Sequence, residues 1–118
     1  MQRFSLDRSK IIRRGSEFNG IFTSGRRVSS ANLTIFYKRG ESLRFGLAVS
    51  RQAGSAVKRN LIKRRLREVA RHHVDLMPDD LNFVILGKPG VARCEFHRFN
   101  QEFVDLLRKV QRASIAFQ

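Results

Sequence analysis

The sequence predicts an α/β (α+β) fold of two layers, in which helices pack on a four-stranded sheet in the order helix, three strands, helix, strand, helix. Two patterns lead to this prediction. Apolar residues alternate with polar or small residues in several short stretches, as in half-buried strands, and they recur every three or four positions in three others, as in amphipathic helices. A chain of 118 residues can form one modest core, so we assign residues 1–118 to a single domain.

The first fifteen residues are basic and mostly aperiodic. We expect residues 1–10 to form a flexible basic arm, and Lys10, Arg13 and Arg14 are its candidate contacts to an anionic partner. A frayed chain end is the alternative interpretation for residues 1–7. A short helix is predicted next, over residues 16–24, because Gly25 can end it and its apolar residues share one face.

Strands are predicted over residues 33–38 and 43–50, and we expect a shorter one over 28–30 before them. The 43–50 stretch alternates regularly, with apolar residues inward and small or charged residues outward. The inward set is Leu43, Phe45, Leu47 and Val49, and the outward set is Arg44, Gly46, Ala48 and Ser50. Since only a short turn separates the two longer strands, we expect them to pair as an antiparallel hairpin.

Three elements are predicted in the second half of the chain: a helix over 55–71, a strand over 81–86 and a helix over 95–110. The strand is apolar on both faces, as expected of a strand buried on both sides. The last helix has an apolar face at i, i+3, i+4 and i+7 spacing. We expect its opposite face to be ordinary solvated surface, with Glu102, Asp105, Arg108 and Lys109.

The net charge of +14 is extreme for a chain of this length. It predicts a polyanionic partner and a strong dependence of binding on salt. An anionic membrane is the competing partner, but no apolar run approaches the ~20 residues that span a bilayer, and the basic helix has no aromatic face to insert. We therefore expect no membrane partner. Cys94 is the only cysteine, which fits a reducing cytoplasm.

The helix over 55–71 separates apolar from basic residues. Gly54 interrupts what precedes it, and Ser55 can cap its first turn. Ile62, Leu66 and Val69, with Ala70, share an arc of roughly 100°, which is the width of a core-facing stripe. Candidate phosphate contacts lie beside this stripe: Lys58, Arg59, Asn60, Lys63, Arg64, Arg67 and Arg71. Like charges at i,i+4 destabilise a helix, so this face indicates a polyanion-binding function.

A second candidate site combines aromatic and small residues. Gly46, Ala48 and Ser50 would leave one face of their strand shallow, and Phe36 would face outward beside them without filling a cavity. Aromatic rings over a sheet with cations at the rim are typical of grooves for single-stranded nucleic acid. The alternative, which spacing alone favours, is that Phe18 and Phe22 are core residues.

The sequence contains no recognisable catalytic or metal-binding motif. Asp79 and Asp80 are interpreted as a turn before a strand rather than as a catalytic pair. Cys94 and the three His have no metal-ligand spacing. We therefore expect no catalytic residue and no cofactor in this chain.

The basic helix resembles the signature helix of the bacterial ribonuclease P protein component. The resemblance rests on Ala56-Val57, Arg59-Asn60, Ile62-Lys63-Arg64 and Arg67. It continues in Glu17-Phe18, Ile21-Phe22 and Gly25, and in the stretch from Leu43 to Ser50, so that it covers roughly residues 8–112. Leu61 departs from the family, which usually has Arg there, and Gln52 departs from a usual basic residue.

The resemblance implies a function, a set of partners and one unusual fold feature. The family has the fold of the second domain of ribosomal protein S5, with a left-handed βαβ crossover through the basic helix. Its protein binds a catalytic RNA, which uses Mg²⁺ to cleave the 5′ leader from precursor tRNA. A cleft beside the first helix binds that leader, and the matching positions here are Phe18, Phe22, Phe36, Ser50 and Arg51.

Two functions follow from these observations. The first is the protein subunit of ribonuclease P, acting as a monomer on its RNA, with the catalytic site in the RNA. The alternative is a non-enzymatic small basic RNA-binding protein of ribosomal or RNA-chaperone type. The net charge does not separate them, whereas an aromatic leader site would favour the first.

Overall fold

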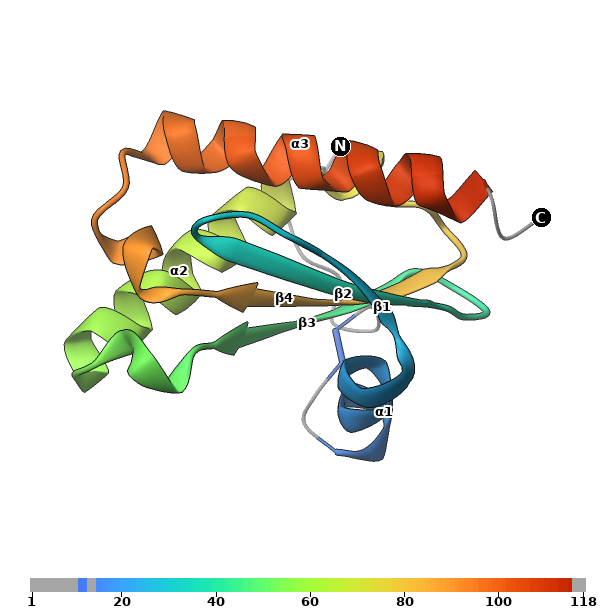
Figure 1. The fold of residues 1–118 in the computed structure, drawn as a ribbon, viewed down its shortest axis with the longest axis horizontal. Helices are drawn as coiled ribbons and strands as arrows, with labels where there is room; N and C mark the ends of the chain where they lie inside the picture. The colour runs from blue at the N-terminus through green and yellow to red at the C-terminus, as the bar shows by residue number, and fades with distance from the viewer. Residues whose placement is uncertain (1–10, 13–14, 116–118) are drawn as a thin grey trace.

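A computed structural model describes residues 11–12 and 15–115 of the chain (Figure 1). The helices and strands occur in the predicted order, and their bounds are α1 Ser16–Ser24, β1 Arg26–Ser29, β2 Leu33–Arg39, β3 Arg44–Val49, α2 Ala56–His72, β4 Leu81–Gly87 and α3 Phe96–Ile115. The predicted basic-arm residues Lys10, Arg13 and Arg14 lie outside the described residues. No helix in the described part of the chain is both long enough and apolar enough to cross a bilayer.

The four strands form one mixed sheet in the order β1-β2-β4-β3. β2 is antiparallel to both β1 and β4, whereas β3 is parallel to β4. The predicted hairpin between the second and third strands is therefore wrong, because β4 lies between them. The hairpin forms instead between β1 and β2. β4 is apolar on both faces, and this makes it the strand best suited to a central position.

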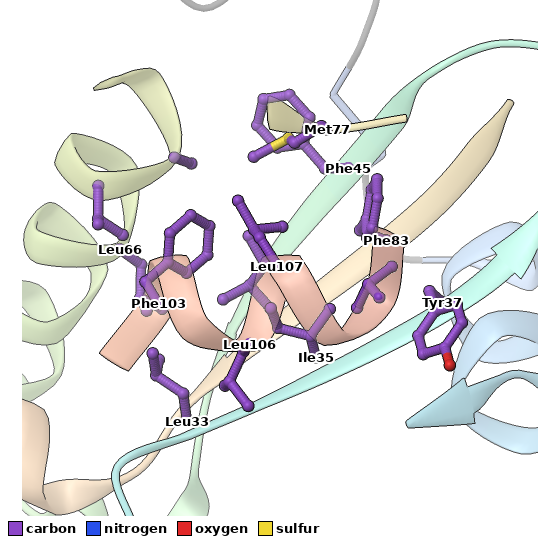
Figure 2. Close-up of a cluster of buried hydrophobic side chains, with 14 of the residues drawn as sticks. Leu33, Ile35, Tyr37, Phe45, Leu66, Met77, Phe83, Phe103, Leu106 and Leu107 are labelled. Atoms are coloured by element: carbon purple, nitrogen blue, oxygen red, sulfur yellow. The ribbon is translucent and has the colours of Figure 1, made fainter. Parts of the chain in front are cut away.

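The main hydrophobic core lies between one face of the sheet and the helices α2 and α3 (Figure 2). From the sheet, Leu33, Ile35 and Phe83 point into it. Helix α2 contributes the predicted stripe of Ile62, Leu66, Val69 and Ala70, all fully buried, and α3 contributes Phe99, Phe103, Leu106, Leu107 and Val110. The core-facing assignment of both helices is confirmed.

Helix α1 lies on the opposite side of the sheet from α3 (Figure 1) and builds a second, smaller core there. This cluster consists of Ile12, Phe18, Ile21, Phe36, Ala48 and Val84, with Phe22 and Leu86 at its margin. The sheet is thus covered on both faces around β4.

Gly25 ends α1 where the chain turns sharply into β1. A Cβ atom at this position would lie 2.5 Å from the Ile21 carbonyl oxygen and 2.8 Å from that of Tyr37. Any side chain would collide with backbone atoms there, so the helix stop predicted at Gly25 is confirmed for a steric reason.

Glu102 corrects one part of the sequence prediction, since it is not an ordinary solvated residue of α3. Its carboxylate accepts hydrogen bonds from Ser30 Oγ, from the Asn32 backbone N–H at 2.9 Å and from Asn32 Nδ2 at 3.0 Å. Lys88 Nζ donates to the Ser30 carbonyl oxygen from the other side, at 2.8 Å. The β1–β2 turn is therefore fixed to α3, which needs an acceptor at position 102.

Candidate nucleic-acid interface

Helix α2 begins where the sequence predicted. The Ser55 side chain accepts a hydrogen bond from the Lys58 backbone N–H at 3.3 Å, as an N-cap does. The apolar stripe then fixes the rotation of the helix on the sheet. As a result, the basic residues at the other helical positions face away from the core.

Five of the predicted contacts on α2 are exposed: Lys58, Asn60, Lys63, Arg64 and Arg67. None of these side chains forms a hydrogen bond or an ion pair with another residue that the structure describes. The only acid of the helix, Glu68, forms an ion pair with Arg71. This half of the helix surface therefore presents cations without internal counter-charges, which is the arrangement that binds phosphates.

Arg59 and Arg71, also predicted as contacts, are both half-buried and have partners in the protein. Arg59 Nη1 donates to the Ser50 carbonyl oxygen at 3.0 Å. Arg71 hydrogen-bonds to Glu68, and this bond is the main reason why the pKa of Glu68 is lowered. These two arginines have less freedom to bind a phosphate than their exposed neighbours have.

Arg65 is basic but structural. Its Nη1 donates to the carbonyl oxygens of Val91, at 2.8 Å, and Cys94, at 2.6 Å. It ties α2 to the turn before α3, and it was not among the predicted RNA contacts.

The aromatic residues predicted for a leader site lie together on the α1 face of the sheet. The ring centroids of Phe18 and Phe22 are 5.2 Å apart, and those of Phe22 and Phe36 are 4.5 Å apart. Phe18 and Phe36 are only 4% and 8% exposed, whereas Phe22 is half-buried at the margin of the cluster. Of the three, Phe22 is the ring most available to a ligand.

The expectation that Phe36 faces an open, shallow surface is wrong. The small residue Gly46 does leave space, but Phe18 fills it, since a Cβ atom at Gly46 would lie 2.9 Å from Phe18 Cε2. Phe36 then packs between α1 and Val84 of β4. The burial of Phe18 is what the core interpretation predicted, whereas that interpretation did not include Phe36.

Ser50 and Arg51, the other predicted members of this site, lie in the link from β3 to α2. Ser50 Oγ accepts a hydrogen bond from the Gln52 backbone N–H at 3.2 Å and begins a short 3₁₀ turn over Arg51–Ala53. Arg51 and Gln52 are exposed. Because Arg59 bonds to the carbonyl of Ser50, this link joins the basic face of α2 to the end of β3.

One feature of α2 that sequence reasoning missed is an open hollow of about 560 Å³ on its outward side. Its lining residues are Val57, Asn60, Leu61, Lys63, Arg64 and Arg67. Val57 is 78% exposed, although it is apolar. The signal was present in the sequence as two apolar residues, four positions apart, outside the core arc.

No group of three or more His, Cys, Asp or Glu side chains in the described part of the chain is arranged to hold a metal ion.

Comparison with known proteins shows the family to which the chain belongs. The family model described as Ribonuclease P matches residues 6–111. The "Ribonuclease P protein component" of Desulfovibrio desulfuricans is 36% identical over 118 residues, covering 95% of this chain and 91% of the relative. The protein of the same name from Desulfotalea psychrophila is 37% identical over 94 residues, or 78% of each chain.

Solved structures have the same fold. A Staphylococcus aureus RNase P protein mutant superposes with a TM-score of 0.77 at 20% identity, covering 87% of this chain and 89% of that one. The Thermotoga maritima RNase P protein gives 0.70 at 23% identity, covering 79% and 90%. The chain therefore belongs to the bacterial ribonuclease P protein family and is a protein subunit of ribonuclease P, an endoribonuclease holoenzyme of tRNA processing.

Proposed function

We propose that the outward face of α2 binds the catalytic RNA of ribonuclease P, mainly through its phosphates. The observation that carries this proposal is the run of exposed cations without internal partners, with Lys63, Arg64 and Arg67 at its centre. Lys58 and Asn60 extend the face toward the helix N-terminus. Arg59 and Arg71 contribute less, because hydrogen bonds to Ser50 and Glu68 already hold them.

Replacing Lys63, Arg64 and Arg67 together by Ala tests this proposal. The slope of log K against log salt is about −0.9 per phosphate contact for a duplex, so losing three contacts reduces its magnitude by roughly two to three. Filter-binding titrations with a bacterial ribonuclease P RNA at several KCl concentrations measure this slope. The melting temperature should stay close to that of the native chain, because the three side chains are exposed. An unchanged slope with a folded protein would place the RNA on another surface.

We further propose that the α1 side of the sheet contacts the 5′ leader of precursor tRNA. Phe22 supports this, as a half-buried ring at the margin of the aromatic cluster that can stack with a base. Arg51, exposed in the link after β3, can pair with a leader phosphate. In this proposal Phe18 and Phe36 hold Phe22 in place, and Ser50 shapes the turn that presents Arg51.

The proposal assigns the cleavage chemistry and its Mg²⁺ ions to the RNA, and it gives this chain a binding role. A cationic subunit would reduce the phosphate repulsion between two RNA molecules, which Mg²⁺ must otherwise screen. Cleavage of precursor tRNA by the RNA alone and with the protein added, at falling Mg²⁺ concentration, measures this contribution. An identical Mg²⁺ requirement in both reactions would contradict it.

We also propose that one copy of the chain acts per RNA and that it does so in the cytoplasm. The single cysteine, half-buried Cys94, fits a reducing compartment. Sedimentation of the reconstituted particle gives the number of copies, and a mass with two protein chains per RNA would overturn the first statement. Fractionation of cells tests the second, and recovery of the chain with the membrane fraction would overturn it.

A further inference from the structure

An apolar pair lies within the basic, outward face of α2. Val57 is 78% exposed, and Leu61, one turn later, is half-buried. Residues four apart lie on the same side of a helix, and this side is opposite the buried stripe of Ile62 and Leu66. The two side chains line the hollow of about 560 Å³ together with Asn60, Lys63, Arg64 and Arg67.

The composition of the hollow specifies the chemistry of its occupant. Three of the six lining residues are cations and none is an acid, so the occupant carries negative charge. The side chains of Val57 and Leu61 make no favourable contact with a phosphate group, so the occupant also has an apolar face. Asn60 adds an amide that can both donate and accept hydrogen bonds. A nucleotide with an unstacked base combines all three properties.

We propose that the hollow takes one unpaired nucleobase of the catalytic RNA, with its face on Val57 and Leu61 and its phosphates on the cations. The proposal rests on the proposed function of α2 and adds to it a contact with a base. It makes Leu61 an RNA contact in its own right, although the family usually has Arg at this position.

A base contact and a phosphate contact respond differently to salt, and this difference separates them. Apolar contacts release no counterions, so removing them lowers affinity by the same factor at every salt concentration. Removing a phosphate contact changes the slope as well. We therefore expect replacement of the apolar residues to lower the affinity without changing the salt slope. Replacement of the cations should lower the affinity and change the salt slope as well.

The test uses the full-length protein with Val57→Ala and Leu61→Ala combined, titrated with a bacterial ribonuclease P RNA at several KCl concentrations. Uncovering roughly 40–60 Å² of apolar contact corresponds to a loss of about fivefold to tenfold in Kd, with the salt slope unchanged. Long-chain polyphosphate, which has phosphates but no bases, is the second ligand. Its affinity should not change. Phe96→Ala, at an exposed apolar residue of α3, is the matched control and should bind the RNA normally.

Each other outcome overturns the proposal. Equal losses for RNA and polyphosphate would mean that the double variant only disturbs the helix. Normal RNA binding, with reduced binding to phosphatidylserine vesicles, would mean that the hollow contacts lipid. If the triple variant of Lys63, Arg64 and Arg67 loses RNA binding while the apolar variant does not, the base contact fails and the proposed function of α2 stands. If neither variant loses binding, the proposed function fails too.

Discussion

The aromatic residues on the α1 face differ in how much they contribute to the second core. Phe36 is 8% exposed and packs against Val84 and α1, so it belongs to the second core. Phe22 lies at the margin of the same cluster, with its ring centroid 4.5 Å from that of Phe36. The two rings touch, yet only one of them can be removed without leaving a cavity.

Phe36→Ala is expected to destabilise the protein by about 3–5 kcal/mol, as do other replacements of a buried Phe by Ala. Phe22→Ala should cost distinctly less, because part of its ring is already in water. Urea unfolding of both variants, followed by circular dichroism, measures the difference. Equal losses of stability would mean that Phe22 is as much a core residue as Phe36, and would leave the leader site without an accessible ring.

The helices and strands whose apolar residues recur at a regular spacing were predictable from the sequence. Three sets of core-facing residues are as predicted: the buried stripe of α2, the apolar face of α3 and the inward set of β3. A helix or strand that is buried on one face has apolar residues at a regular spacing in its sequence, and this spacing can be recognised. The bounds of α1 and α2 were also close, since Ser55 and Gly25 act locally, whereas α3 continues to Ile115, beyond its predicted end at residue 110.

Pairing between strands was not predictable in the same way. The short turn between β2 and β3 favoured a hairpin, but β4 takes the place between them, from more than thirty residues away in the sequence. Only its two apolar faces hinted at a central position. The same limit applies to Phe36 and Glu102. Whether an outward residue is exposed to water or covered by another helix or strand depends on tertiary packing, and the local spacing of apolar residues does not show this.

Within α2, the ion pair between Glu68 and Arg71 restrains one cation of the face proposed to bind RNA. The hydrogen bond from Arg71 lowers the pKa of Glu68. A glutamate carboxylate is charged at neutral pH even without this shift, so the ion pair persists there. A neutral side chain at position 68 would remove the counter-charge and leave Arg71 available to a phosphate.

Glu68→Gln is therefore expected to tighten binding to ribonuclease P RNA and to steepen the salt slope by up to about one. The folded state should be little affected, because ion pairs that remain in contact with water contribute little to stability. Asp105→Gln, on the exposed face of α3, makes the same change of net charge away from α2 and serves as the control. A steeper slope in both variants would show that total charge, and not Arg71, is responsible.

At the scale of the whole molecule, the two surfaces proposed to bind RNA lie on different elements, the outward face of α2 and the α1 face of the sheet. On one side, α2 presents its unpaired cations; on the other, α1 holds the aromatic cluster over the sheet. The Ser50 backbone connects α2 with the sheet, since its N–H donates to the Gly87 carbonyl at 2.9 Å and its carbonyl accepts from Arg59 at 3.0 Å. Under the two proposals, one chain with a net charge of +14 contacts the catalytic RNA through α2 and the substrate RNA through the α1 side of the sheet.

If the two surfaces bind different RNAs, Phe22→Ala should affect only the substrate. Stacking of a base on an aromatic ring contributes about 1–3 kcal/mol, so the holoenzyme reconstituted with this variant should bind precursor tRNA about tenfold more weakly. Its affinity for mature tRNA, which lacks the leader, and the affinity of the variant for the catalytic RNA should stay unchanged. Titrations with both tRNAs at low Mg²⁺, where the protein contributes most, make the comparison. Arg51→Ala should weaken the same complex with a smaller salt slope. A tenfold loss for mature tRNA as well would mean that Phe22 supports the body of the tRNA or the fold, and that the leader lies elsewhere.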